Sequence, residues 1–270
     1  MKNLNWHFPA DVEEAAQLVK KDGLVPHAGG TGILLANLHK RKDLIDLSAL
    51  PLHFSEVKEN SVEIGSMATY ADIIDIFSKI NPEHILVKSL QDSANTPLRN
   101  RITLGGSIAH YPPWTDLIGA LLALDTQINL EGAHSGTFAL QKYLATKSLQ
   151  RKTLITSVEI PLSDWKAYAY RQVRTKNDMP IFHITIIMKQ NKNKIIDSRI
   201  IITGNIGRYK RFEKVENYLE GRDAKDIDLD KIRSMIDVQF AGKNIDDPKY
   251  TSHLAAVEIS RGIDQLRGEK

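Results

Sequence analysis

The spacing of apolar and polar positions predicts two regions with different architectures. In the N-terminal region, short strand-like runs alternate with helical segments. Residues that favour helix N-termini precede the helices, namely Asp11 with Glu14, Thr69, and Thr115 with Asp116. Strands are expected at 24–25, 44–47, 61–65, 127–130 and 153–160. Helices are expected at 11–21, from near Thr31, after Thr69, at 83–94 and at 115–124, with a loop over 95–101.

A different pattern follows a hinge at 161–165. Three consecutive strands are expected at 167–174, 181–189 and 195–203, followed by helices at 210–219, 229–239 and 252–266. Strands followed by helices indicate an α+β lobe. The chain therefore divides into a domain over 1–162, with sublobes of about 1–52 and 53–162, and a second domain over 165–270.

Composition narrows the function classes. The chain has 270 residues, and its net charge of +3 comes without a long basic run, which disfavours nucleic acid as a partner. There is no signal-peptide pattern and no run of about 18 apolar residues, so no transmembrane segment is expected. The absence of cysteine excludes disulfides, iron–sulfur ligation and a cysteine nucleophile within this chain, and it is consistent with a cytoplasmic protein. The sequence indicates no metal site and no catalytic side chain.

Two glycine-rich stretches are the most informative local feature. The first glycine stretch is residues 28–32, Ala-Gly-Gly-Thr-Gly, and the second is residues 103–110, Thr-Leu-Gly-Gly-Ser-Ile-Ala-His. A backbone without Cβ atoms can approach an oxygen-rich ligand closely and offer it several N–H groups. Each stretch has a hydroxyl residue beside its glycine pair. Together they predict a long ligand held from both sides, for which a dinucleotide with its pyrophosphate is the natural candidate.

The order and spacing of these stretches and their neighbours resemble one known family. Residues 28–31 and 44–48 are similar to the first flavin loop and next strand of the FAD-binding medium subunits of molybdenum hydroxylases. That group contains the xanthine, carbon monoxide and nicotinate dehydrogenases. Residues 99–100, 103–110, 113, 116–117 and 121–125 resemble the family's second motif, while 154–161, 170–178 and 204–221 resemble its later parts. The resemblance is collinear and covers nearly the whole chain.

The resemblance implies an α+β fold, with a two-lobed FAD-binding domain of the vanillyl-alcohol-oxidase-like (PCMH) type and a C-terminal domain. It implies non-covalent FAD and two partner subunits: a large subunit that holds molybdopterin and a small subunit with [2Fe–2S] clusters. A dimer of heterotrimers is the expected assembly. Electrons would pass between the clusters and an external acceptor such as NAD or a quinone, through the flavin of this chain. The substrate would be set by the molybdenum subunit.

The resemblance also assigns cofactor-binding residues. Glycine-stretch residues would hold the pyrophosphate and ribityl chain, Asp116 would accept a sugar hydroxyl or act as a helix cap, and Ile155 and Arg171 would lie near the isoalloxazine ring. The full set is His27, Ala28, Gly29, Gly30, Thr31, Gly32, Ile33, Thr103, Gly105, Gly106, Ser107, His110, Asp116, Ile155 and Arg171.

Three departures from the family pattern keep other functions open. Gly32 stands where the family usually has Asp or a polar residue, His110 stands where a small or polar residue is common, and residues 111–114 are bulkier than expected. Gly32 and the bulky residues 111–114 motivate the alternative of a scaffold subunit that has lost FAD. A stand-alone FAD-dependent oxidoreductase is a further alternative. The short C-terminal lobe, which lacks an evident substrate cluster, argues against it.

Overall fold

Two compact units make up this computed structural model, which describes residues 5–33, 43–175, 178–242 and 245–268. Unit 1 contains 1–76, 95–111 and 124–162, and unit 2 contains 77–94, 112–123 and 163–270, each less the undescribed residues. The predicted boundary at 162–165 divides the chain by sequence position, whereas each unit combines segments that are separate in sequence. The predicted domain division therefore stays a prediction.

Unit 1 begins with a small parallel sheet that leads into the first glycine stretch. Its strand order is β1-β3-β2. The predicted strands at 24–25 and 44–47 are confirmed and pair in parallel, with Val25 opposite Leu44. The helix predicted from near Thr31 falls largely on 34–42, outside the described residues. The bounds are Asn5–His7 for β1, which the sequence did not predict, Leu24–His27 for β2 and Asp43–Asp46 for β3.

Helix α1, Val12–Leu18, begins as its sequence predicts. The Asp11 carboxylate accepts the Glu14 N–H at 2.8 Å, which satisfies one of the N–H groups that a helix start leaves without a partner. The Glu14 side chain accepts a second N–H, that of Ala10, at 2.7 Å. The helix ends three residues before the predicted position 21.

A five-stranded antiparallel sheet forms the body of unit 1, in the order β4-β5-β8-β6-β7. One face is apolar and fully buried, and contains Val62, Ile64, Ile128, Val158 and Ile160. The other face carries hydrogen-bonded polar side chains, so the period of two that predicted these strands reflects one buried and one polar face. The bounds are Ser55–Val57 for β4, Ser61–Gly65 for β5, Gln127–Gly132 for β6, Gly136–Ala139 for β7 and Thr153–Pro161 for β8.

Short helices connect these strands. Thr69 and Asp72 cap α2 reciprocally, as expected for a helix that starts after Thr69. A helix, α4, occupies part of the segment 95–101 that was expected to be a loop, because Asn95 accepts the Leu98 N–H and Pro97 fits the first turn. The bounds are Tyr70–Ile80 for α2, which continues into unit 2, Thr96–Arg99 for α4, Leu104–His110 for α5, Leu140–Ala145 for α7 and Lys147–Gln150 for α8.

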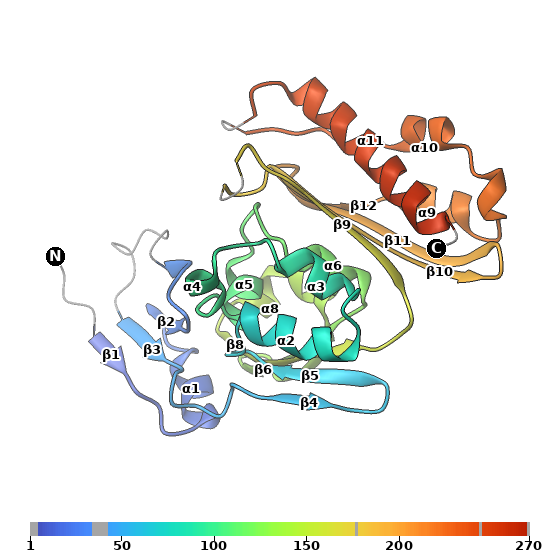
Figure 1. Cartoon of the computed structure of the whole chain (residues 1–270). Coiled ribbons are helices and arrows are strands. Elements are labelled where there is room, and N and C mark those ends of the chain that lie inside the picture. The colour runs from blue at the N-terminus through green and yellow to red at the C-terminus, as the bar shows by residue number, and fades with distance from the viewer. Residues whose placement is uncertain (1–4, 34–42, 176–177, 243–244, 269–270) are drawn as a thin grey trace. The chain divides into compact units, whose positions relative to one another are not determined.

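Unit 2 is built on an antiparallel sheet with helices on both faces (Figure 1). The strand order is β12-β11-β10-β9. The bounds are Lys166–Gln172 for β9, Phe182–Asn191 for β10, Lys194–Gly204 for β11 and Arg208–Arg211 for β12. The three long strands and the helices that follow them were predicted, whereas β12 was not. Helices α3, Ile85–Leu90, and α6, Ile118–Ala123, cover one face.

The opposite face of this sheet packs against the C-terminal helices α9, Glu213–Leu219, α10, Leu229–Met235, and α11, Pro248–Arg267 (Figure 1). A short 3₁₀ turn, Ala224–Asp226, precedes α10. The core between them contains Phe182, Ile184, Ile186, Ile202, Val215, Leu219, Ile259 and Ile263. Across the described ranges, no helix combines the length and the apolar composition needed to cross a membrane.

Candidate functional site

The first glycine stretch is a turn at the end of β2. Gly30 has a φ of +78°, a left-handed conformation that glycine adopts without strain. A Cβ atom built on Gly30 would lie 3.1 Å from Nε2 of His27, so the turn folds back on the last residue of the strand. The His27 ring also contacts the Trp6 ring edge-on, with centroids 4.9 Å apart. His27 and Gly30 therefore form one side of the turn, and a side chain at position 30 would be strained.

The backbone of this turn is open to a ligand. Within the described part of the chain, the N–H groups of Gly29, Gly30, Thr31 and Gly32 have no protein acceptor. Consecutive N–H groups in a turn form a concave donor surface that suits anionic oxygen atoms. These four donors are the strongest structural support for an anionic ligand in unit 1. Ala28 and Ile33 flank them and are half-buried.

The second glycine stretch is a helix, α5, and not a loop. Thr103 caps it, and its hydroxyl accepts the Gly106 N–H at 3.3 Å. The N–H groups of Leu104 and Gly105 donate to carbonyls outside the helix, those of Ala68 and Ser66, both at 2.8 Å. The start of α5 therefore has its donors satisfied by the chain itself, in contrast to the first stretch.

Close packing explains the glycine at position 105. A Cβ atom built there would lie 2.7 Å from the Ser66 Cβ, a distance that real side chains do not adopt. Gly106 differs because it is exposed and its Cβ would meet only the Thr103 hydroxyl, at 2.7 Å. Ser107 is buried and His110 is exposed. On this helix, Gly106 and His110 are the candidate residues that a ligand can reach from solvent.

The two glycine stretches lie against each other. A Cβ built on Gly29 would fall only 1.6 Å from the Arg101 carbonyl oxygen, so only glycine permits this approach. The Arg101 side chain reinforces the contact, because Nε and Nη2 both donate to the Gly29 carbonyl, at 3.2 and 3.0 Å. Further along, a Cβ on Gly32 would lie 3.3 Å from the His110 ring. The candidate residues of both stretches thus form one surface of unit 1.

Ile155 is joined to this surface through Ser66. The pairing of β6 with β8 shifts between Ser157 and Ile155, so Thr156 bulges out of the ladder. The Thr156 carbonyl accepts the Ser66 N–H at 2.9 Å, and the Ser66 carbonyl accepts the Gly105 N–H. Ser66 was not identified from the sequence. Its position after a strand gave no signal that it would connect a bulge to a helix start.

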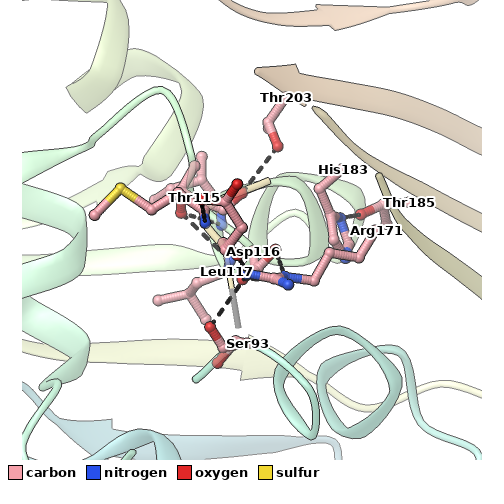
Figure 2. Close-up of polar contacts among 11 residues, drawn as sticks. Ser93, Thr115, Asp116, Leu117, Arg171, His183, Thr185 and Thr203 are labelled. Atoms are coloured by element: carbon pink, nitrogen blue, oxygen red, sulfur yellow. Dashed lines mark hydrogen bonds and ion pairs between the residues drawn. The ribbon is translucent and has the colours of Figure 1, made fainter. Parts of the chain in front are cut away.

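Asp116 and Arg171 belong to unit 2, where they form a buried ion pair (Figure 2). Arg171 Nε contacts both carboxylate oxygens of Asp116, at 3.3 and 3.2 Å. Asp116 does not cap α6, contrary to one of its two predicted roles. Thr115 caps that helix, because its hydroxyl accepts the N–H groups of Leu117 and Ile118. The carboxylate of Asp116 is thereby free to pair with Arg171.

The remaining contacts of Arg171 hold three segments together. Its Nη2 donates to the Asp178 carbonyl at 2.7 Å and reaches the Ser93 carbonyl at 3.5 Å. The side chains are well buried, with 5% of Asp116 and 14% of Arg171 exposed. Burial raises the pKa of Asp116 to about 7, although the Arg171 charge acts in the opposite direction.

His183 lies beside Arg171 (Figure 2). Complete burial lowers the pKa of His183 to about 3, and the positive charge of Arg171 adds to this effect. The ring is therefore neutral, and it lies within hydrogen-bond distance of the Thr185 hydroxyl. No group of three or more His, Asp or Glu side chains within the described ranges is arranged to hold a metal ion.

Comparison with known proteins identifies the family. Residues 2–163 match the model of the FAD-binding domain in molybdopterin dehydrogenases. The chain is 26% identical over 243 residues to the glyceraldehyde dehydrogenase medium chain of Sulfolobus acidocaldarius, covering 85% of each chain. It is also 26% identical over 230 residues to the nicotine 6-hydroxylase medium subunit of Paenarthrobacter nicotinovorans, covering 81% of this chain and 80% of that subunit.

Solved structures agree on the fold. A chain of reconstituted CO dehydrogenase from Oligotropha carboxidovorans superposes with a TM-score of 0.88 at 20% identity, covering 98% of each chain. A chain of quinoline 2-oxidoreductase from Pseudomonas putida 86 gives 0.87 at 19% identity, covering 98% of this chain and 97% of that one. The predicted α+β fold and the predicted family are both confirmed. The chain belongs to the FAD-binding domain family of molybdopterin dehydrogenases and is a FAD-binding medium subunit of an oxidoreductase of the molybdenum hydroxylase group.

Proposed function

We propose that this chain holds FAD non-covalently in unit 1 and transfers electrons between the [2Fe–2S] clusters of a small partner subunit and an external acceptor such as NAD or a quinone. The observation that carries the proposal is the contact between the two glycine stretches, where four backbone N–H groups have no acceptor within the described part of the chain. A pyrophosphate needs donors of this kind held at close range.

The residues of unit 1 fit such a cofactor. Gly29, Gly30 and Gly32 leave the first glycine stretch without side chains over most of its length, and Gly30 takes a conformation that few other residues tolerate. A side chain at Gly29 would collide with the Arg101 carbonyl, and one at Gly32 would press on the His110 ring, so these glycines keep the two stretches close together. The absence of cysteine removes a cysteinyl link to the flavin, and His27 precedes the glycine pair and does not follow it, so we assign a non-covalent flavin.

The two stretches support the cofactor in different ways. The N–H groups from Gly29 to Gly32 bind phosphate oxygens, while His27, Ala28 and Ile33 shape the ends of the turn. On α5, Gly106 and His110 offer exposed surface. Thr103, Gly105 and Ser107 hold the helix in place by capping and packing.

One further residue of unit 1 is proposed to act toward the ring. Ile155 lies beside the β8 bulge in unit 1 and offers its backbone. In unit 2, Asp116 accepts hydrogen bonds only from Arg171 within the described residues, so its carboxylate retains acceptor capacity. Its role toward a sugar hydroxyl stays a prediction from the resemblance. Arg171 also belongs to unit 2, and its role near the isoalloxazine ring stays a prediction from the resemblance. FAD, when bound, supplies the redox chemistry, and the protein positions and tunes it.

The proposed function also requires partner subunits. We propose a large molybdopterin-binding subunit and a small [2Fe–2S] subunit as partners, in a dimer of heterotrimers. The names of the relatives support this, since they are called medium chains or medium subunits. Within this chain, we assign FAD binding to residues 1–162 and the C-terminal domain to residues 165–270.

The first experiment is the visible spectrum of the purified full-length chain, followed by heat release and identification of any cofactor. We expect the absorption bands of an oxidised flavin and the release of intact FAD. A chain that stays colourless after incubation with excess FAD would contradict the proposal and favour a scaffold subunit. Co-purification with iron–sulfur and molybdenum subunits would then test the partners independently of the flavin.

A further inference from the structure

We propose that Arg101 is a phosphate-binding and positioning residue for the dinucleotide, an inference that rests on the proposed FAD site. Arg101 is absent from the cofactor residues that the sequence indicates. It contacts the first glycine stretch in two ways: its carbonyl oxygen packs on Gly29, and its side chain binds the Gly29 carbonyl through Nε and Nη2. The same residue thus sets the position of the stretch and holds a cation beside it.

The location of the guanidinium suits an anion. Arg101 Nη2 lies 3.6 Å from the position that a Cβ of Gly30 would occupy, next to the backbone donors of the turn. A phosphate bound by the N–H of Gly30 would therefore lie within reach of the Arg101 head group. No other candidate residue of unit 1 carries a permanent positive charge.

Most of the binding capacity of Arg101 is unused. A guanidinium has five N–H donors, and two of them meet the Gly29 carbonyl. Within the described ranges, no carboxylate and no other acceptor engages the rest of this side chain. A planar cation fixed on one edge and free on the other can bind phosphate oxygens with little further loss of conformational freedom.

This arrangement distinguishes two roles that a substitution alone would confuse. If Arg101 only held the first glycine stretch in place, the partner of its side chain would be the neutral Gly29 carbonyl. Removal of the Arg101 side chain would then weaken FAD binding equally at all salt concentrations. If it also binds phosphate, part of its contribution is an interaction between charges that added salt screens. The salt dependence of FAD affinity therefore separates the two roles.

The test measures FAD dissociation constants for the full-length wild type, R101K and R101Q over a range of salt concentrations. The control is R151Q, which removes the same charge from another exposed position of unit 1. We expect R101Q to lower FAD affinity roughly 10- to 100-fold at low salt. We also expect it to flatten the salt dependence, with R101K retaining most of the wild-type slope. R151Q should match the wild type in both quantities.

Each outcome decides between the roles. An unchanged affinity in R101Q, or a reduced affinity with the wild-type salt slope, overturns phosphate binding by Arg101. The melting temperature of each cofactor-free variant identifies any loss of folding, and R101K provides the comparison should R101Q not fold. If the wild type itself takes up no FAD, the proposed function fails. If the wild type binds FAD and R101Q binds it with the same affinity, only the inference about Arg101 is refuted.

Discussion

The two glycine stretches have similar sequences but different structures. The first is a turn with a left-handed Gly30 and four N–H groups without acceptors within the described residues. The second is the start of a helix, in which Thr103 and two carbonyls outside the helix take up the donors. A glycine pair alone therefore does not define an anion-binding loop. The residues around it decide whether the missing Cβ atoms serve a ligand or serve packing.

This difference gives two measurable quantities for every glycine substitution. One is the affinity for FAD, and the other is the free energy of unfolding of the cofactor-free chain. A position that serves the ligand changes mainly the first quantity, and a position that serves packing changes mainly the second.

Gly29→Ala should have the largest effect, and on both quantities. Its Cβ would lie 1.6 Å from the Arg101 carbonyl oxygen, so the first glycine stretch must move away from Arg101, which precedes α5. We expect unfolding to become easier by about 1–3 kcal/mol and FAD affinity to fall by more than about 100-fold. Calorimetry of the cofactor-free chain and flavin titration measure the two. Retained FAD affinity would show that contact between the stretches is not needed for the site.

Gly105→Ala should mainly reduce stability. The added Cβ would lie 2.7 Å from the Ser66 Cβ and 3.1 Å from its carbonyl oxygen, which disturbs the bond that fixes the start of α5. We expect a loss of about 1–3 kcal/mol in the free energy of unfolding. FAD affinity of the folded fraction should change much less than in Gly29→Ala. A large loss of affinity at wild-type stability would contradict the packing role.

Long buried elements of this fold were predictable from the sequence. Strands β10 and β11 carry runs of isoleucine that bury both faces of the sheet, and the helix starts at Asp11 and Thr69 carry their own caps. The strands that were missed, β1, β4, β7 and β12, are short edge strands of three or four residues. Their conformation depends on pairing with a neighbouring strand, and the local pattern of apolar and polar residues does not show such pairing.

The candidate site shows the same limit. Glycine pairs are easily recognised in a sequence, so both stretches were found. The partner of Gly29 was missed because Arg101 is 72 positions away and contacts it through a carbonyl oxygen that every residue possesses. Thr115 and Asp116 are both residue types that cap helices. In the structure Asp116 pairs with Arg171 and Thr115 is left to cap the helix. Because Arg171 is 55 positions from Asp116, the sequence alone did not distinguish the two roles.

Gly30→Ala tests the first glycine stretch by itself, because the nearest atoms to its added Cβ belong to the side chains of His27 and Arg101 and not to α5. Alanine in a left-handed conformation is strained by about 1 kcal/mol, and its Cβ would lie 3.1 Å from the His27 ring. We expect a small loss of stability and a roughly 10-fold loss of FAD affinity, because the methyl group occupies the donor surface. The matched control is Gly207→Ala, another left-handed glycine with no neighbour near its Cβ position. An equal change of FAD affinity in both variants would remove the first stretch from the site.

Gly106→Ala should have the smallest effect on stability and asks whether α5 meets the cofactor directly. Alanine favours the helix by about 0.5–1 kcal/mol, and the 2.7 Å approach of its Cβ to the Thr103 hydroxyl offsets this gain. The free energy of unfolding should therefore stay within about 0.5 kcal/mol of the wild type. Because Gly106 is exposed, a cofactor packed on this backbone would lose several-fold in affinity. Unchanged flavin titration would instead mean that the second glycine stretch only supports the first, and that the open turn at residues 28–32 carries the dinucleotide alone.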